Sequence, residues 1–350
     1  MIKAEPDFGA KYIEINHPKP NAKEIVVRPE AAAICGTDIH LYEWDEAAVN
    51  FTKNFQINFP LVLGHEFSGE VVELGSEVKN IKAGDRVALE THIPCGKCYQ
   101  CSIGNRHNCQ NMGLYGITYN GCFADYAIAP AEVAFVLPEG VSYEEGALFE
   151  PAGVAMRAIE EAAIQPGDTV LIYGCGPIGQ LAIQMANVCG AAKVIAIDIN
   201  PFRINMARAL QATTINAKEK DAVAVVKEFT RDKGGVDVAI ELTGSSSVYK
   251  NIFEMIRLEG RLVTVGHPSK EVAINITKDV NQKGLALKGV FGRRIWSTWQ
   301  HLAGLVEEKK IDLLKVVTHR FKLDQYEEAF KKANEDACKI LFVQNININE

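Results

Sequence analysis

The strongest constraint on the fold lies in the second half of the chain, where short apolar runs alternate with helix-like stretches. After about residue 151 the chain reads TVLIYG, a helical stretch over 177–189, KVIAID, a helix from about Pro201, VDVAIEL, a further helical stretch and RLVTVG. Such continuous apolar strands, alternating with helices, are typical of a parallel sheet that helices cover on both faces. The sequence therefore predicts a doubly wound α/β domain.

The first strand of this series is followed by a glycine motif that favours a dinucleotide. Gly174, Gly176 and Gly179 form GCGPIG between VLIY and a helical pattern, which is the context that the dinucleotide fingerprint requires. Glycine permits the tight turn, the close approach of backbone to pyrophosphate and the close packing of helix on strand. Asp198, which ends the next strand, lies where a carboxylate can bind both ribose hydroxyls and repel a 2′-phosphate, so NAD is favoured over NADP. The alternative for Asp198 is a helix N-cap before Pro201.

Four of the nine cysteines crowd into the fifteen residues CGKCYQCSIGNRHNC, as Cys95, Cys98, Cys101 and Cys109. Four thiolates at these spacings can enclose one tetrahedral Zn²⁺, and such a closed site stabilises the fold and does not catalyse. An iron–sulfur cluster, or cysteines that are buried or disulfide-bonded, are the alternatives.

Composition narrows the class of protein. The 350 residues suffice for two domains, and the first part, from Ile25 to Gly84, is expected to be β-rich and irregular. A net charge of −7 gives no excess of basic residues for nucleic acid or an anionic membrane. No apolar run is long enough to cross a bilayer and the first residues lack the pattern of a secretory signal, so a cytoplasmic location is expected.

Four residues ahead of the glycine motif are candidate ligands of a second metal ion: Cys35 in ICGTDIH, His65 and Glu66 in GHEFSG, and Glu150 in FEPAG. Thiolate, imidazole and carboxylate all bind zinc, and a site with three protein ligands and one open position is a catalytic one. Spacing alone does not assign this site, because a single cysteine is usually a small core residue and a single His–Glu pair is usually part of a surface turn.

Taken together and in this order, ICGTDIH, GHEFSGEVVELG, the four-cysteine segment, GCGPIG and Asp198 resemble the zinc-containing medium-chain alcohol dehydrogenases over essentially the whole chain. The resemblance implies a Rossmann doubly wound parallel sheet together with a β-rich GroES-like catalytic domain. It implies a discontinuous catalytic domain of residues 1–152 and 293–350 around an NAD-binding domain of residues 153–292. It also implies one catalytic and one structural Zn²⁺ per subunit, and a homo-oligomer, with tetramers common.

The resemblance assigns a role to each site residue. Cys35, His65 and Glu150 match the catalytic zinc ligands, Glu66 matches an exchangeable ligand, and Thr37 and His40 match a relay that carries the substrate proton to solvent. The residues expected at the dinucleotide are Gly174, Gly176, Pro177, Ile178, Gly179, Asp198, Arg203 and Gly266. For His40 the alternative is an ordinary surface histidine.

Within the family, ICGTDIHLYEWDE, ETHIPCGKC and GVFGRRIWSTW with its following THRF are similar to threonine dehydrogenases, and sorbitol-type polyol dehydrogenases are the nearest relatives. His92 matches a histidine of the threonine pocket, with a packing role as the alternative. One departure is Val154, in EPAGVA, where threonine dehydrogenases typically have an asparagine.

The function implied by the resemblance is oxidation of a secondary alcohol to a ketone by hydride transfer to NAD. The substrate is L-threonine, giving 2-amino-3-oxobutanoate, or a related small hydroxy compound, and a polyol is the alternative. A zinc-ribbon module leaves GCGPIG and Asp198 unexplained. A non-catalytic zinc-binding structural or interaction protein is disfavoured because Cys35, His65 and Glu150 are all present.

Overall fold

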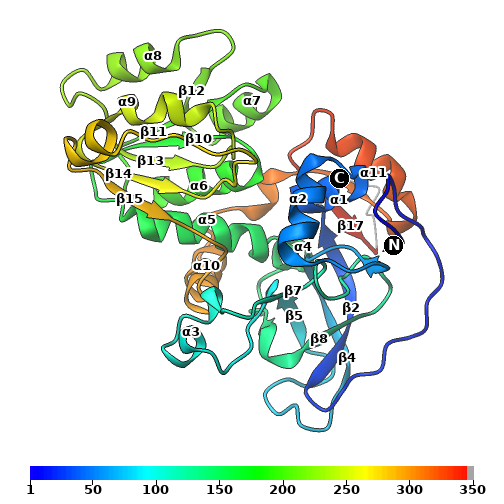
Figure 1. Cartoon of the computed structure of the whole chain (residues 1–350). Coiled ribbons are helices and arrows are strands. Elements are labelled where there is room, and N and C mark those ends of the chain that lie inside the picture. Colours follow the sequence, from blue (N-terminus) through cyan, green and yellow to red (C-terminus); the bar gives the residue numbers. More distant parts are fainter. Residues whose placement is uncertain (345–350) are drawn as a thin grey trace. The chain divides into compact units, whose positions relative to one another are not determined.

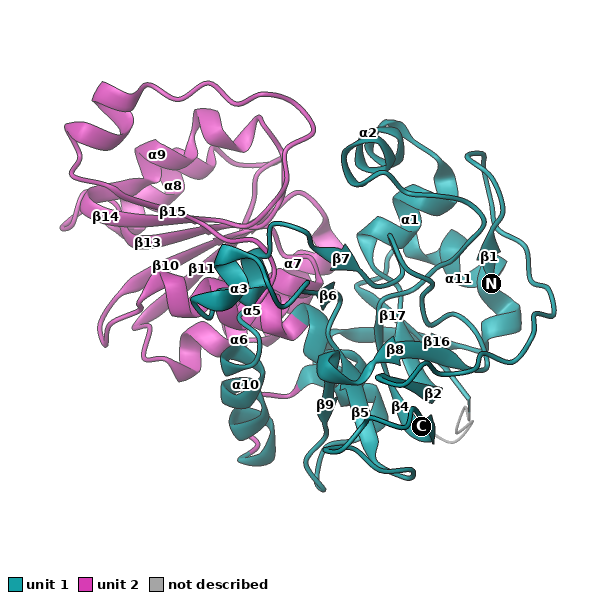
Figure 2. Ribbon diagram, turned by 60° about the horizontal axis from the view of Figure 1, so that its bottom comes forward, with its two compact units in different colours: residues 1–151, 294–308, 313–350 teal, residues 152–293, 309–312 magenta. Residues whose placement is uncertain are grey.

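The computed structural model describes residues 1–344, which divide into two compact units (Figures 1 and 2). Unit 1 comprises residues 1–151, 294–308 and 313–350, and unit 2 comprises residues 152–293 and 309–312. Of the helices in the described part of the chain, none is long and apolar enough to cross a membrane.

Unit 2 is built on a six-stranded parallel sheet with the order β12-β11-β10-β13-β14-β15. In chain order its strands are β10 (Thr169–Tyr173), β11 (Lys193–Asp198), β12 (Thr213–Asn216), β13 (Val236–Glu241), β14 (Ile256–Thr264) and β15 (Ala286–Gly289). Counted along the unit this order is 3-2-1-4-5-6, which is that of the Rossmann fold. The predicted doubly wound parallel sheet is therefore confirmed. The strand order reverses between β10 and β13, and ligands of such sheets bind at the carboxyl ends of the strands at this point.

The strands of unit 2 form because their sequences suit full burial. Every residue of β10 and of β13 is buried, as expected for the central strands of a parallel sheet. The helices of this unit are α6 (Pro177–Val188), α7 (Pro201–Ala209), α8 (Ala222–Phe229) and α9 (Ile252–Met255), and α5 (Phe149–Ala162) enters it from unit 1. Both α6 and α7 begin with proline, whose fixed φ suits the first helical position.

Unit 1 is organised around a seven-stranded sheet in which most neighbouring strands are antiparallel. The strand order is β16-β17-β2-β4-β5-β9, with β8 also paired to β2. These strands are β2 (Glu24–Ala33), β4 (Glu66–Leu74), β5 (Arg86–Leu89), β8 (Ala127–Pro130), β9 (Ala134–Val136), β16 (Val317–Phe321) and β17 (Lys339–Val343). Figure 1 shows β17 beside β2, so a late strand completes a sheet that begins near the N-terminus.

Two small sheets and six helices complete unit 1. The sheets pair β1 (Ile2–Lys3) with β3 (Leu61–Val62) and β6 (His92–Ile93) with β7 (Gly113–Leu114). The helices are α1 (Gly36–Glu43), α2 (Glu46–Phe55), α3 (Tyr99–Ser102), α4 (Tyr143–Ala147), α10 (Ser297–Glu307) and α11 (Tyr326–Ala333). The sequence did not separate α1 and α2 from the surrounding β-rich runs. Asp45 explains the start of α2, because its carboxylate accepts a hydrogen bond from the N–H of Ala48.

Candidate functional site: two metal centres and a dinucleotide cradle

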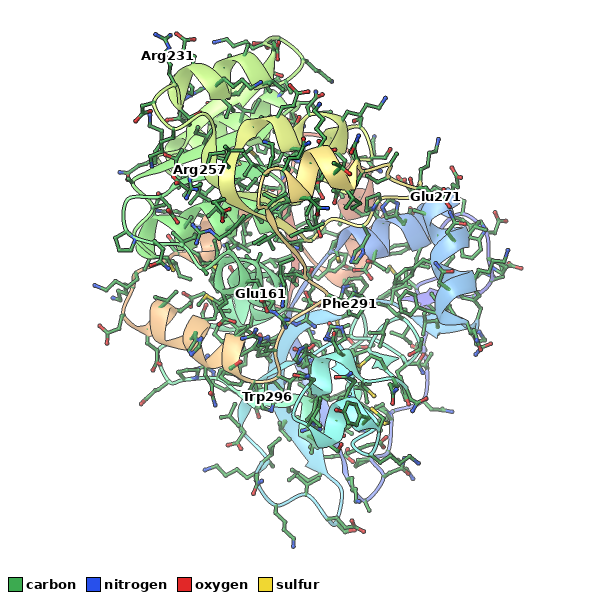
Figure 3. The ribbon with its side chains drawn as sticks, turned by 60° about the vertical axis from the view of Figure 1, so that its left-hand side comes forward. Glu161, Arg231, Arg257, Glu271, Phe291 and Trp296 are labelled. Atoms are coloured by element: carbon green, nitrogen blue, oxygen red, sulfur yellow. The ribbon has the colours of Figure 1, made fainter. Side chains whose placement is uncertain are left out.

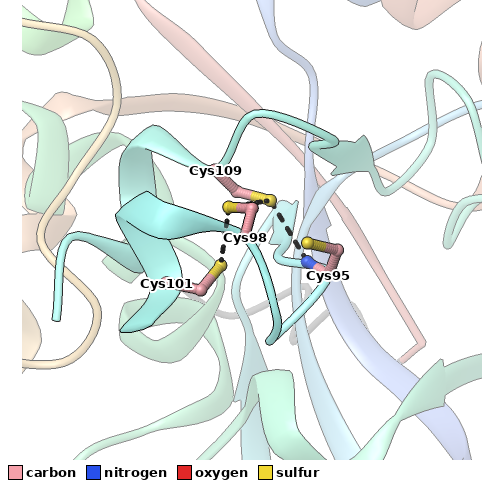
Figure 4. A group of neighbouring side chains, drawn as sticks. All are labelled: Cys95, Cys98, Cys101 and Cys109. Atoms are coloured by element: carbon pink, nitrogen blue, oxygen red, sulfur yellow. Dashed lines mark hydrogen bonds between the residues drawn. The ribbon is translucent and has the colours of Figure 1, made fainter. Parts of the chain in front are cut away.

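The four clustered cysteines converge in a loop of unit 1, as Figure 4 shows. The Sγ atoms of Cys95, Cys98, Cys101 and Cys109 all lie within 4.8 Å of one another. Cys98 immediately precedes α3, Cys101 lies within it, and Cys109 follows a short 3₁₀ turn at residues 106–108. The Sγ of Cys98 lies 3.5 Å from that of Cys101 and 3.8 Å from that of Cys109. None of the nine cysteines, all within residues 1–344, forms a disulfide.

This geometry fits a tetrahedral zinc ion. Zn–S bonds of about 2.3 Å place the sulfur atoms of a tetrahedron about 3.8 Å apart. Backbone N–H groups already favour thiolates: those of Lys97 and Cys98 lower the pKa of Cys95 to about 6, and those of Cys101 and Gln110 lower the pKa of Cys98. Because all four ligand positions are sulfur, the site is closed, as structural zinc sites are.

A second group of ligand atoms lies where the start of α1 and the start of β4 come together. The Sγ of Cys35, a ring nitrogen of His65 and a carboxylate oxygen of Glu66 all lie within 4.8 Å of one another. Cys35 directly precedes α1, and Glu66 begins β4 directly after His65. The Nδ1 atom of His65 is buried and makes no hydrogen bond to any residue of the described chain. A buried histidine beside a cysteine and a carboxylate gives the mixed donor set that suits zinc.

Asp38 supports both Cys35 and His65 and was not identified from the sequence. It is fully buried in α1. Its Oδ2 accepts a hydrogen bond from the N–H of Cys35 at 2.9 Å, and its Oδ1 accepts one from the N–H of Gly64 at 3.1 Å. The Oδ1 atom also lies 3.7 Å from Nδ1 of His65. Such outer carboxylates orient the groups that bind a metal. The sequence signal that could have identified Asp38 is its place three residues after Cys35, which is the N3 position of a capping box.

Lys339 is a second functional residue that the sequence did not reveal. Its Nζ lies 2.6 and 2.9 Å from the two carboxylate oxygens of Glu66, and it also donates to the carbonyl of Ile34. Both side chains are buried. Burial acts to lower the pKa of Lys339, but the negative charges of Glu66 and Cys35 outweigh it and the pKa is raised. The ammonium therefore stays charged and gives Glu66 a partner that competes with a metal ion.

Glu150, expected among the metal ligands, lies in the first turn of α5 and is buried. The group of mutually close ligand atoms comprises Cys35, His65 and Glu66, and it does not include Glu150. Its Oε1 accepts a hydrogen bond from the hydroxyl of Thr91 at 2.7 Å. The structure thus brings three of the four expected ligands together, while Glu150 contributes negative charge that raises the pKa of nearby Glu66.

The dinucleotide motif forms a cradle at the carboxyl end of β10. Gly174 has φ of 107°, a conformation that side chains disfavour. A Cβ at Gly179 would lie 1.9 Å from the carbonyl oxygen of Gly174, so only glycine allows α6 to pack this close to the strand. A Cβ at Gly176, the N-cap of α6, would meet no atom within 4 Å. The residues Pro177 and Ile178 form the first turn of α6, whose N–H groups and dipole favour a pyrophosphate beside this open space.

Asp198 ends β11 at the same edge. Its Oδ2 accepts a hydrogen bond from the N–H of Cys175, and its Oδ1 accepts from the N–H groups of Ile199 and Asn200. Asn200 is the N-cap of α7, so Asp198 is not the helix N-cap that the sequence offered as an alternative. Asp198 thus ties the glycine turn to the end of β11.

Two further expected dinucleotide contacts lie in unit 2. Arg203 lies in α7, and its carbonyl accepts a hydrogen bond from Gln180 of α6. Gly266 follows β14, and a Cβ there would lie 2.2 Å from the N–H nitrogen of Gly244. The buried Glu241 fixes the backbone at Gly244 in this close approach to Gly266, because its Oε1 accepts hydrogen bonds from the N–H groups of Thr243 and Gly244.

Comparison with known proteins identifies the family. Residues 21–139 match the model of an alcohol dehydrogenase GroES-like domain, and residues 177–308 match that of a zinc-binding dehydrogenase. The chain is 38% identical to L-threonine 3-dehydrogenase of Pyrococcus furiosus, over 95% of this chain and 94% of the relative. The chain belongs to the zinc-containing medium-chain alcohol dehydrogenases. It is therefore an oxidoreductase that acts on CH–OH groups with zinc and NAD.

Solved structures agree with this assignment. The fold superposes on the 2R,3R-butanediol dehydrogenase of Bacillus subtilis with a TM-score of 0.86 and 31% identity, over 98% of this chain and 99% of that one. It also superposes on an alcohol dehydrogenase of Escherichia coli CFT073 complexed with NADH, with a TM-score of 0.88 and 26% identity over 98% of each chain. The expected family, fold class and enzyme class are thus confirmed for this dehydrogenase.

The expected proton relay lies on α1 of this dehydrogenase. Thr37 is half-buried, and His40, one turn later on the same helix, is exposed. The Nδ1 atom of His40 lies 2.6 Å from Oδ2 of Asp45, the N-cap of α2. This contact orients the exposed imidazole ring, and the role of His40 in a relay stays a prediction.

His92, expected in the substrate pocket, is buried in β6 of the dehydrogenase. One carboxylate oxygen of Glu90, which is itself fully buried, lies 2.9 Å from both the backbone nitrogen and Nδ1 of His92.

Proposed function

We propose that this dehydrogenase oxidises the secondary hydroxyl of L-threonine to the ketone, giving 2-amino-3-oxobutanoate and NADH. The observation that carries the proposal is the close group of half-buried Cys35 with buried His65 and Glu66, in a chain 38% identical, over nearly its full length, to a threonine dehydrogenase.

When bound, zinc supplies positive charge that lowers the pKa of the substrate hydroxyl, and NAD accepts the hydride from the substrate carbon. In this proposal Cys35, His65 and Glu150 hold the metal, and Glu66 exchanges between it and Lys339. The hydroxyl proton passes to Thr37 and then to His40, whose exposed ring, held by Asp45, releases it to solvent.

In unit 2 we propose that Gly174, Gly176, Pro177, Ile178 and Gly179 bind the pyrophosphate, and that Asp198 binds the ribose hydroxyls. Arg203 and Gly266 are proposed to flank the rest of the dinucleotide. The open space at Gly176 and the carboxylate at the end of β11 support this assignment. An aspartate at this place favours NAD over its 2′-phosphorylated form.

A polyol or diol is the second candidate substrate. Val154 stands where threonine dehydrogenases typically have an asparagine, and one of the similar solved structures is a butanediol dehydrogenase. His92, oriented by Glu90, is the side chain proposed to recognise the substrate in either case.

The test is the absorbance of NADH at 340 nm during incubation of the zinc-loaded protein with NAD and, separately, threonine, sorbitol, butanediol and simple alcohols. Threonine is expected to turn over fastest. The control is Cys35→Ser, which is expected to abolish turnover while NAD affinity, measured by calorimetry, persists. Turnover of sorbitol or butanediol above threonine would favour the second candidate, and full activity of Cys35→Ser would contradict the metal assignment.

We also propose that the catalytic domain is residues 1–152 with 293–350, that the NAD domain is residues 153–292, and that the enzyme is a cytoplasmic homotetramer. The two compact units and the absence of disulfides among the nine cysteines support the domain division and a reducing compartment. Light scattering of the purified protein tests the tetramer.

A further inference from the structure

Thr91 is placed to act on the metal centre from outside the group of ligands. It lies directly between Glu90 and His92, and only 5% of its surface is exposed. Its carbonyl accepts a hydrogen bond from the N–H of Tyr115 at 2.8 Å, which fixes the backbone of this segment. The backbone that carries the Thr91 side chain is therefore held in place.

The hydroxyl of Thr91 faces two acceptors. Its Oγ1 lies 2.7 Å from Oε1 of Glu150 and 3.4 Å from the backbone carbonyl of His65. A hydroxyl has one proton to donate, and the closer acceptor, the carboxylate, forms the stronger bond. The proton therefore goes to Glu150.

The surroundings of Glu150 make this bond consequential. The negative charges of Glu150 and Glu66 repel, and Glu66 has Lys339 as its cation, at 2.6 Å. The Thr91 hydroxyl is one donor to Glu150. Without it, Glu150 would lose this buried donor, and repulsion from Glu66 would favour a different position of the carboxylate.

We propose that Thr91 is a positioning residue of the catalytic metal centre, whose hydroxyl sets the position of the carboxylate of Glu150, a proposed metal ligand that lies outside the close group of Cys35, His65 and Glu66. This inference rests on the proposed function only in taking that centre as the catalytic zinc site. Loss of a hydrogen-bond partner of a metal-binding side chain typically weakens metal affinity by about 10 to 100 times.

The test compares Thr91→Val, which removes the hydroxyl at nearly constant shape, with Thr91→Ser, which keeps it. The matched control is Thr230→Val, because Thr230 is equally buried in unit 2 and its hydroxyl donates only to the carbonyl of Val226. Thr91→Ala is the second variant should Thr91→Val fail to fold.

Each protein is stripped of metal and titrated with Co²⁺, in competition with a chelator. The visible spectrum of the catalytic centre is taken as the difference from Cys35→Ser, which retains the four-cysteine site. Thr91→Val is expected to shift this difference spectrum and to weaken Co²⁺ binding about tenfold, whereas Thr91→Ser and Thr230→Val match the wild type. A spectrum and affinity of Thr91→Val equal to those of Thr230→Val would overturn the proposal.

The same measurements separate this proposal from the proposed function. A wild-type protein that binds Co²⁺ at the Cys35 centre but reduces no NAD with any alcohol would refute the function. The spectral comparison of the Thr91 variants would still decide the role of the hydroxyl.

Discussion

At the scale of single residues, the buried ion pair of Lys339 with Glu66 predicts an effect on stability. Removing one partner of a buried ion pair leaves an uncompensated charge and typically costs about 3–5 kcal/mol. We expect Lys339→Met to lower the free energy of unfolding by this amount in urea titrations, and Lys339→Met combined with Glu66→Gln to recover part of it. Lys339→Arg, which keeps the charge, is the control, and an unchanged stability of Lys339→Met would contradict the pairing.

A second residue, Asp237 of β13, predicts a dependence of stability on pH. Burial opposes its ionisation, but hydrogen bonds from the N–H of Thr169 and the side chains of Lys233 and Arg257 outweigh burial and lower its pKa from 3.8 to about 2. Arg257, labelled in Figure 3, donates its Nε–H to Oδ1 at 2.7 Å. Ionised Asp237 thus stabilises the folded state by about 2 kcal/mol above its unfolded pKa.

Because the folded-state pKa is the lower one, this contribution is complete above about pH 4 and is lost as the pH falls toward 2. We expect Asp237→Asn to be less stable than the wild type by a constant amount between about pH 5 and 7, and the difference to shrink below about pH 4. Urea unfolding at a series of pH values measures it. A difference in unfolding free energy that grows as the pH falls would contradict this prediction.

Which residues the sequence reveals depends on how local their partners are. Gly174, Gly176 and Gly179 act within one turn, so their spacing alone predicts the cradle. Lys339 lies 273 residues after Glu66, and its pairing arises only because β17 returns to β2. Likewise the contact of Thr91 with Glu150 spans 59 residues, and no local pattern encodes it.

At the scale of elements, the cysteine segment is the least able to hold its shape without an ion. Helix α3 has four residues, and none of them is buried. So short and exposed a helix is not stable by itself, and we infer that the metal supplies much of its folding free energy.

We therefore expect Cys98→Ser to lower the zinc content from two ions per chain to one and to lower the melting temperature, while Cys35→Ser retains the zinc of this segment. Plasma emission spectrometry of the zinc content and thermal unfolding measure the two effects. Two zinc ions with an unaltered melting temperature in Cys98→Ser would contradict the structural role.

The helices of unit 1 show why elements were harder to predict than in unit 2. In unit 2 the strands β10, β11 and β13 are mainly apolar runs that alternate with helices, so two signals agree. The strands β12 and β15, which lack such a run, were not predicted. In unit 1, α1 contains GTDIHLYE, where the buried residues include Asp38. A polar residue on the buried face, required by the site, weakens the apolar period that would have predicted the helix.

At the scale of the whole molecule, the chain builds one unit from a continuous segment and the other from separated ones. All six strands of the unit 2 sheet lie within residues 152–293, whereas the unit 1 sheet needs β16 and β17 from the end of the chain. The second half of the sequence predicted its sheet well for the same reason. The return of the tail is visible only through the family resemblance.

This division predicts the behaviour of fragments. We expect residues 152–293, expressed alone, to fold and to bind NAD despite the loss of the two hydrogen bonds between Gln184 and Asp312. Residues 1–151 alone are expected to remain unfolded, because β2 then lacks β17 as a neighbour. Circular dichroism and calorimetry with NAD measure both outcomes, and a folded 1–151 fragment would contradict the argument.

The position of Lys339 also sets an order of events during synthesis. Its partner Glu66 leaves the ribosome early, followed by Glu150 and then by the whole of unit 2, before the strand that carries the ammonium is made. Until β17 is made, Glu66 lacks the ammonium that pairs with it, so this buried ion pair can form only after nearly the whole chain has been synthesised.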